Sequence, residues 1–129
     1  MIKKFWEDEL LKEMMRRGGL TKRQLECLII QASGEKKETL NEKVSRITDR
    51  KMTKPAFVIT RERAKKNVKA AFYTLIIVNY LSLVAPDCFL SFDKVALLLK
   101  EMQNKEITSE QVRAVINTLE GLITRILLV

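Results

Sequence analysis

Six residues near the middle of the chain have the side-chain chemistry to hold phosphate groups. Five carry a positive charge and one carries a hydroxyl: Lys51, Thr53, Lys54, Arg61, Lys65 and Lys66. A threonine at the start of a helix, together with the first backbone N–H groups, can hold one phosphate. We expect Lys54 and Arg61 to face the groove of a bound polyanion. The other three lysines are expected to neutralise its flanking phosphates.

The net charge of +8 comes from one window of the sequence. Residues 36–69 hold twelve Lys/Arg against four Asp/Glu, whereas residues 1–35 hold seven against six and residues 70–129 hold five against six. A basic field this local lowers the energy of a docked polyanion, and counterion release adds to the binding. The alternative is a solvated basic face with no partner. An acidic lipid surface fits less well because the window lacks an exposed apolar stripe.

The composition predicts a protein that is not an enzyme. The chain has no histidine, which removes the commonest general base and transition-metal ligand. Its two cysteines are too few for a Cys₄ zinc site, and the sequence has no glycine-rich phosphate loop. We therefore predict no catalytic residue, no metal site and no cofactor, with an unrecognised carboxylate pair as the alternative. Free, buried thiols and the lack of a signal-peptide pattern predict a cytoplasmic protein.

A long helix over residues 53–84 is expected to position the cations. Pro55 suits the first helical turn, and Pro86 is expected to end the helix because a proline disfavours helical backbone in the residue before it. In the first half, Phe57 begins a narrow apolar arc that leaves a charged flank. From Leu75 onward the helix is apolar all round, which predicts that its second half is covered on every side.

Shorter helices are predicted before and after the long one. The apolar spacing places them at residues 2–17, 20–33, 38–50, 91–104 and 109–128. Two of them begin with the capping-box pattern, Thr21 with Gln24 and Thr108 with Gln111. No segment alternates like a strand, and the apolar run over 70–85 is short for a bilayer. We predict a single all-α domain over residues 1–129, with a long central helix and a C-terminal helical hairpin.

Two segments resemble known DNA-binding regulators. GGLTKRQLECLIIQASG looks like the opening of regulators related to sigma-factor promoter-reading domains, and TKPAFVITRERAKKNVKAA resembles the recognition helix of archaeal Tfx-type regulators. Within the second segment, Thr53, Lys54, the Arg63-Ala64 pair and Asn67 match the pattern. The resemblance covers residues 18–72 and implies a helix-turn-helix that binds double-stranded DNA, in a transcriptional regulator or nucleoid-type protein. The segment between Gly34 and Lys54 is longer than in that pattern.

The apolar content after residue 72 predicts a homodimer. Residues 75–84, 92–99 and 112–129 carry more apolar surface than a monomer of this size hides. Two-fold pairing of the C-terminal helices through Ile123 and Leu127 would cover it, so residues 73–129 are expected to supply the core and the dimer contacts. Alternatively, the C-terminal helices wrap the central helix within one chain.

A different function class also fits the basic window. The chain could be a helical protein–protein adaptor or an RNA-binding subunit of a larger assembly. Its basic face would then meet an acidic protein or RNA in place of duplex DNA. Both functions use the same cations, so the two differ in the ligand that binds rather than in the residues.

Overall fold

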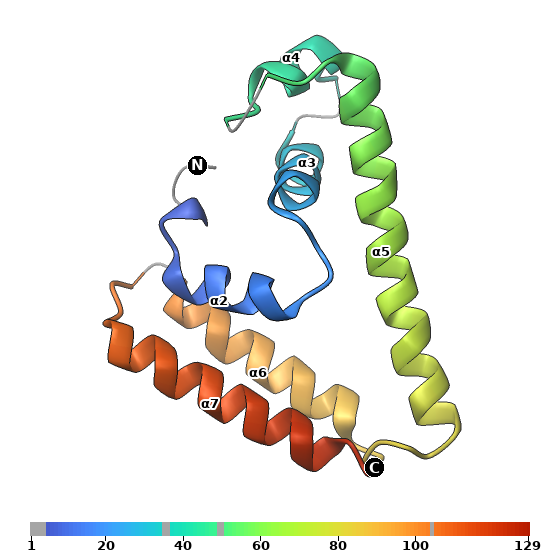
Figure 1. Ribbon diagram of the computed structural model, residues 1–129, viewed down its shortest axis with the longest axis vertical. Helices are drawn as coiled ribbons and strands as arrows, with labels where there is room; N and C mark the ends of the chain where they lie inside the picture. The colour runs from blue at the N-terminus through green and yellow to red at the C-terminus, as the bar shows by residue number, and fades with distance from the viewer. Residues whose placement is uncertain (1–4, 35–36, 49–50, 104) are drawn as a thin grey trace. The chain divides into compact units, whose positions relative to one another are not determined.

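The computed structural model describes residues 5–34, 37–48, 51–103 and 105–129. Its named helices are α2 (Glu9–Arg17), α3 (Lys22–Ser33), α4 (Leu40–Ser45), α5 (Lys54–Tyr80), α6 (Cys88–Met102) and α7 (Ser109–Ile126) (Figure 1). In these ranges the extended structure consists of a single antiparallel bridge between Val84 and Leu127. The predicted all-α class is confirmed. No helix in this part of the chain is both long and apolar enough to cross a membrane.

The chain forms two compact units, each with its own core. The first unit runs up to Glu7 and then over Met15–Phe72, and the second comprises Asp8–Met14 and Tyr73–Val129. Helix α5 contributes its first part to the first unit and its last two turns to the second.

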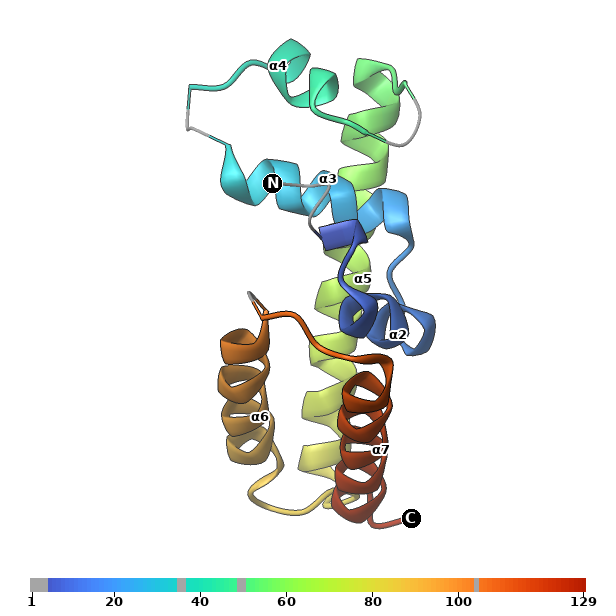
Figure 2. The ribbon, with the colours of Figure 1, turned by 90° about the vertical axis from the view of Figure 1, so that its left-hand side faces the viewer.

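The first unit is built around Phe57, which is fully buried on α5. Cys27 and Ile30 of α3 and Met52 complete the buried cluster, and side chains of α4 and the residues around it pack against them. Within this unit, α4 and α3 lie at successive levels along the first half of α5 (Figures 1 and 2). Because Phe57 lies one turn after the start of α5, its burial fixes that end of the helix against α3 and α4.

Both predicted capping boxes are present. Thr21 Oγ1 accepts from the Gln24 N–H at 3.2 Å, and Gln24 Oε1 accepts from the Thr21 N–H at 3.1 Å. Thr108 and Gln111 exchange the same two bonds at 3.2 and 2.8 Å. Each pair satisfies two backbone groups at a helix start that would otherwise lack partners.

Two helices, α2 and α4, are shorter than predicted, and in both a capping residue sets the start. The expected helix over 2–17 is interrupted because Asp8 caps α2, accepting from the Leu11 N–H at 2.9 Å; residues 1–4 lie outside the described ranges. The expected helix over 38–50 is much shorter. Thr39 caps it and it ends at Ser45, while residues 49 and 50 are outside the described ranges.

Helix α5 ends earlier than predicted, in a Schellman motif. Ser82 has a φ of 57°, the left-handed conformation that closes such a motif. The Leu83 N–H donates to the Val78 carbonyl at 2.8 Å, and the Ser82 N–H donates to the Asn79 carbonyl at 3.0 Å. The helix therefore stops at Tyr80, well before Pro86. A serine in this place is a weak sequence signal, since glycine is the usual residue there.

Helices α6 and α7 run in opposite directions in the second unit (Figures 1 and 2). Val112 and Ile116 of α7 form a buried cluster with Leu10, and Leu99 of α6 packs against this cluster. Helix α6 begins at Cys88, earlier than the predicted Ser91 start, because the Ser91 N–H already bonds to the Asp87 carbonyl at 3.0 Å.

The C-terminal backbone is held by hydrogen bonds. The Ala85 N–H donates to the Ile126 carbonyl and the Leu128 N–H donates to the Leu83 carbonyl, both at 2.9 Å. Val84, Cys88 and Ile126 form a small buried cluster beside this bridge. Helix α7 therefore ends at Ile126, two residues before its predicted end.

The all-round apolar character of the second half of α5 predicted that it is covered on every side. The structure shows that it is not. Val78 packs against the cluster around Cys88. By contrast, Tyr73, Ile76, Ile77 and Tyr80 are exposed. This part of the prediction is wrong for a single chain, because these four apolar side chains are left uncovered.

Candidate nucleic-acid interface

The start of α5 is set by two anchors, one polar and one apolar. Thr53 caps the helix, since its Oγ1 accepts from the Ala56 N–H at 3.2 Å. Met52 is buried, with its sulfur 3.9 Å from the Cys27 sulfur that donates to it. Because Met52 is held in the core, Lys51 and Thr53 on either side of it are exposed.

Few hydrogen-bond donors remain at the start of α5 to hold a phosphate. Pro55 has no N–H, and the Ala56 N–H is taken by the Thr53 side chain. Of the first three residues of α5, Lys54 has an N–H that is neither missing nor bonded to the Thr53 side chain. Thr53 can still donate its hydroxyl hydrogen, so an anion here would meet one hydroxyl, one N–H and the Lys54 ammonium. This is a smaller phosphate site than the sequence predicted.

Arg61 does not lie on the exposed face, where we expected it to face a groove. Its Nη1 donates to Gln31 Oε1 of α3 at 3.2 Å, and its Nε donates to Glu62 Oε1 at 3.2 Å. The guanidinium also lies 5.9 Å from the centre of the Phe57 ring. With only 19% of its side chain exposed, Arg61 connects α5 to α3 and is not available as a free cation.

Lys65 is exposed but shares its charge with an acidic neighbour. Its Nζ lies 3.4 Å from Glu62 Oε1. Although desolvation raises the pKa of Glu62, hydrogen bonds from Arg61 and Lys65 outweigh it and hold that pKa below its usual value. Glu62 therefore remains an anion among the cations of α5, and it reduces what Lys65 can offer to a ligand.

A row of three cations on the exposed side of α5 is better placed. Arg63, Lys66 and Lys69 are spaced three residues apart, so they follow one another along the helix surface. All three are exposed, and none has a hydrogen bond or ion pair with another residue in the described ranges. The site prediction contained Lys66 but omitted Arg63 and Lys69, although their spacing from Lys66 was a sufficient signal.

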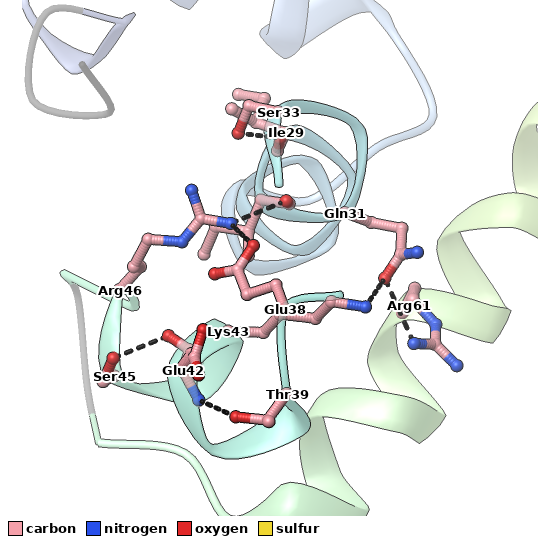
Figure 3. A network of polar contacts seen from close by, with 11 residues as sticks. Ile29, Gln31, Ser33, Glu38, Thr39, Glu42, Lys43, Ser45, Arg46 and Arg61 are labelled. Carbon is pink, nitrogen blue, oxygen red and sulfur yellow. Dashed lines mark hydrogen bonds and ion pairs between the residues drawn. The ribbon is translucent and has the colours of Figure 1, made fainter. Parts of the chain in front are cut away.

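A polar network fixes the helices that support α5 (Figure 3). Gln31 Oε1 of α3 accepts from Lys43 Nζ of α4 at 3.0 Å as well as from Arg61. Arg46, just after α4, donates from Nη2 to the Ile30 carbonyl at 3.0 Å and to Glu38 Oε2 at 2.8 Å. Helices α3, α4 and α5 are thus connected by side chains that have partners on two elements.

Asn67 connects α5 to the loop that precedes α3. Its Nδ2 donates to Gln24 Oε1 at 3.2 Å and to the Gly19 carbonyl at 3.4 Å. The Gln24 oxygen is the same atom that closes the capping box with Thr21. An amide used in this way is not free to read a base edge, so the interface consists of cations and is suited to phosphates.

The geometry supports anion binding more than any other chemistry. Within the described ranges no group of three or more His, Cys, Asp or Glu side chains is placed to hold a metal ion. Of the predicted set, Lys51, Thr53, Lys54, Lys65 and Lys66 are exposed on or beside the first half of α5, and Arg61 is not. No protein-family model, curated protein or solved structure matches the chain.

Proposed function

We propose that the chain binds double-stranded DNA through the exposed cations of the first half of α5. The observation that carries this proposal is the row Arg63, Lys66 and Lys69, with Lys51 and Lys54 at the helix start. Five exposed cations along and beside one helix match the phosphates that line a groove of DNA. The role is that of a cytoplasmic transcriptional regulator or nucleoid-type protein that binds without catalysis.

The order of the elements supports the same function. Two short helices, α3 and α4, precede the longer α5, and all three pack around Phe57. In a helix-turn-helix, the last helix of such a group lies in the major groove. The resemblance of residues 18–72 to Tfx-type regulators places its recognition helix at the same point. Helix-turn-helix binding is therefore the proposed mode.

The test is a salt series of fluorescence anisotropy with a labelled DNA duplex and the pure protein. The double variant Lys66→Ala, Lys69→Ala should bind more weakly, because it loses two phosphate contacts. The slope of log affinity against log salt should fall by about two, since each contact contributes about 0.9. A matched control is Lys94→Ala, Lys100→Ala, which removes two exposed lysines from α6 and should leave the slope unchanged.

Two outcomes would contradict the proposal. An unchanged slope in the Lys66, Lys69 double variant would remove this row from the interface. Absence of binding by the wild-type protein at low salt would reject duplex DNA as the ligand. Binding of single-stranded RNA in the same assay, without duplex binding, would support the adaptor or RNA-binding function.

A further inference from the structure

The second half of α5 presents an apolar face that its own chain leaves open. Tyr73, Ile76, Ile77 and Tyr80 are spaced at i, i+3, i+4 and i+7, which places them on one side of the helix. They are 67%, 56%, 54% and 86% exposed, and Leu81, just after the helix, is 56% exposed. We call these five residues the α5 stripe. The spacing is that of helices that pack side by side.

The α5 stripe differs from the exposed face of α6 that carries Leu90 and Leu97. From Ala70 to Ala85 the sequence contains no charged residue. On α6, by contrast, Asp93 and Lys94 stand between the exposed Leu90 and Leu97. Interface cores are depleted in charge and enriched in aromatic residues. Of these two helix surfaces, the α5 stripe alone has that composition.

The size of the stripe fits a stable interface. Weighted by their exposed fractions, the five side chains offer on the order of 700 Å². This exceeds the few hundred Å² of contiguous apolar surface that a monomer usually leaves open. It is close to the roughly 800 Å² that each partner contributes to a standard protein interface.

We propose that a second copy of this chain covers the α5 stripe, two-fold related and with the two α5 helices antiparallel. The positive charge lies in residues 36–69, whereas residues 70–129 hold five Lys/Arg against six Asp/Glu. Because residues 70–129 carry a net charge of only −1, two copies can approach through this part of the chain with little repulsion. An acidic partner would be attracted to the basic window and would gain nothing at an uncharged stripe.

The orientation follows from the charges on the same helix. Toward its N-terminus, α5 continues beyond the stripe with Lys66 and Lys69. Parallel pairing would set these lysines against their copies, at a cost in repulsion. Antiparallel pairing places them at opposite ends of the interface. This interface, centred near Ile76 and Ile77, differs from the pairing predicted through Ile123 and Leu127, which are also exposed.

The test is the mass of the protein in solution, measured by sedimentation and light scattering over a range of micromolar concentrations. The wild type is expected to have twice the mass of one chain. Ile77→Asp should reduce it to a single chain, because an unpaired carboxylate is costly in an apolar interface. Leu97→Asp is the matched control: Leu97 is 57% exposed and Ile77 is 54% exposed, so neither change opens a core. This control should remain a dimer.

Two further variants distinguish loss of the dimer from loss of folding. Tyr80→Asp changes a residue that is 86% exposed, so its helix content and melting temperature should match the wild type while its dimer is lost. Ile76→Cys should form a disulfide between copies under mild oxidation, since Cys27 and Cys88 are both buried. A monomeric wild type, or a dimer lost in Leu97→Asp but kept in Ile77→Asp, would overturn the proposal. No assay here contains DNA, so failure of DNA binding leaves the result unaffected.

Discussion

Arg61 on α5 donates a hydrogen bond to the side-chain oxygen of Gln31 on α3, at 3.2 Å and across 30 residues of sequence. The same oxygen accepts from Lys43 of α4 at 3.0 Å. One neutral acceptor therefore holds two cations from two helices. Gln31 therefore lets Lys43 and Arg61 approach each other without an anion between them.

Arg61→Met tests whether this arginine supports the fold or contacts DNA. Methionine keeps the apolar stem but loses the hydrogen bond to Gln31. We expect the free energy of unfolding to fall by about 1 kcal/mol, the usual net value of a hydrogen bond. The salt slope of DNA binding should stay unchanged. A slope reduced by about one, with unchanged stability in urea, would show that Arg61 contacts a phosphate.

Three helix starts were predictable because their signals are local. Thr21, Thr53 and Thr108 each cap a helix through an N–H three residues later, so both partners lie within one short stretch of sequence. Helix ends were predicted less well. The left-handed conformation of Ser82 depends on the packing of the residues around it, which spacing alone does not reveal.

The candidate site was predictable as a set of cations but not in its geometry. The local charge excess located the basic helix correctly in sequence. The partners of individual side chains come from other elements: Gln31 for Arg61, and Gly19 for Asn67. Periodicity says which residues share a face, and it does not say which neighbouring helix covers that face. For the same reason the exposed side of α5 after residue 72 could not be anticipated.

Glu26 and Thr48 offer a second test, of a buried carboxylate. Glu26 is fully buried, and its Oε1 accepts from both the Thr48 N–H and the Thr48 hydroxyl, the latter at 2.9 Å. Thr48→Val replaces the hydroxyl with a methyl group, and we expect the lost hydrogen bond to the carboxylate to cost about 1–2 kcal/mol. In a Glu26→Gln background the same change should cost about 0.5–1 kcal/mol. A double-mutant cycle by urea unfolding measures the difference, and equal costs in both backgrounds would contradict this account.

Cys27 predicts a loss of stability at high pH. Burial raises the pKa of its thiol from 9.0 to about 11, and the Glu26 carboxylate adds to the shift. The folded chain thus holds the thiol proton more tightly than the unfolded chain does. The resulting stability is complete below pH 9 and is lost as the pH rises toward 11.

The measurement compares the wild type with Cys27→Ala, which lacks this thiol and keeps Cys88. The advantage of the wild type in free energy of unfolding should shrink by about 2 kcal/mol between neutral pH and pH 11. Every other ionisable group, Cys88 included, is present in both proteins and cancels from the comparison. A difference that stays constant with pH would show that the Cys27 thiol has an ordinary pKa.

Ser82→Gly should stabilise the protein, although it removes a side chain. Ser82 has a φ of 57°, and a residue with a Cβ is strained in that conformation whereas glycine is not. Relief of this strain should exceed the extra freedom that glycine gains in the unfolded chain, so we expect a gain of about 0.5–1 kcal/mol. Ala96→Gly is the control, because Ala96 is exposed in the interior of α6 and the same new residue should cost up to about 1 kcal/mol there. Thermal and urea unfolding of both variants measure whether each change raises or lowers the free energy of unfolding. If Ser82→Gly also destabilises the protein, the end of α5 is not held by the left-handed turn that closes its Schellman motif.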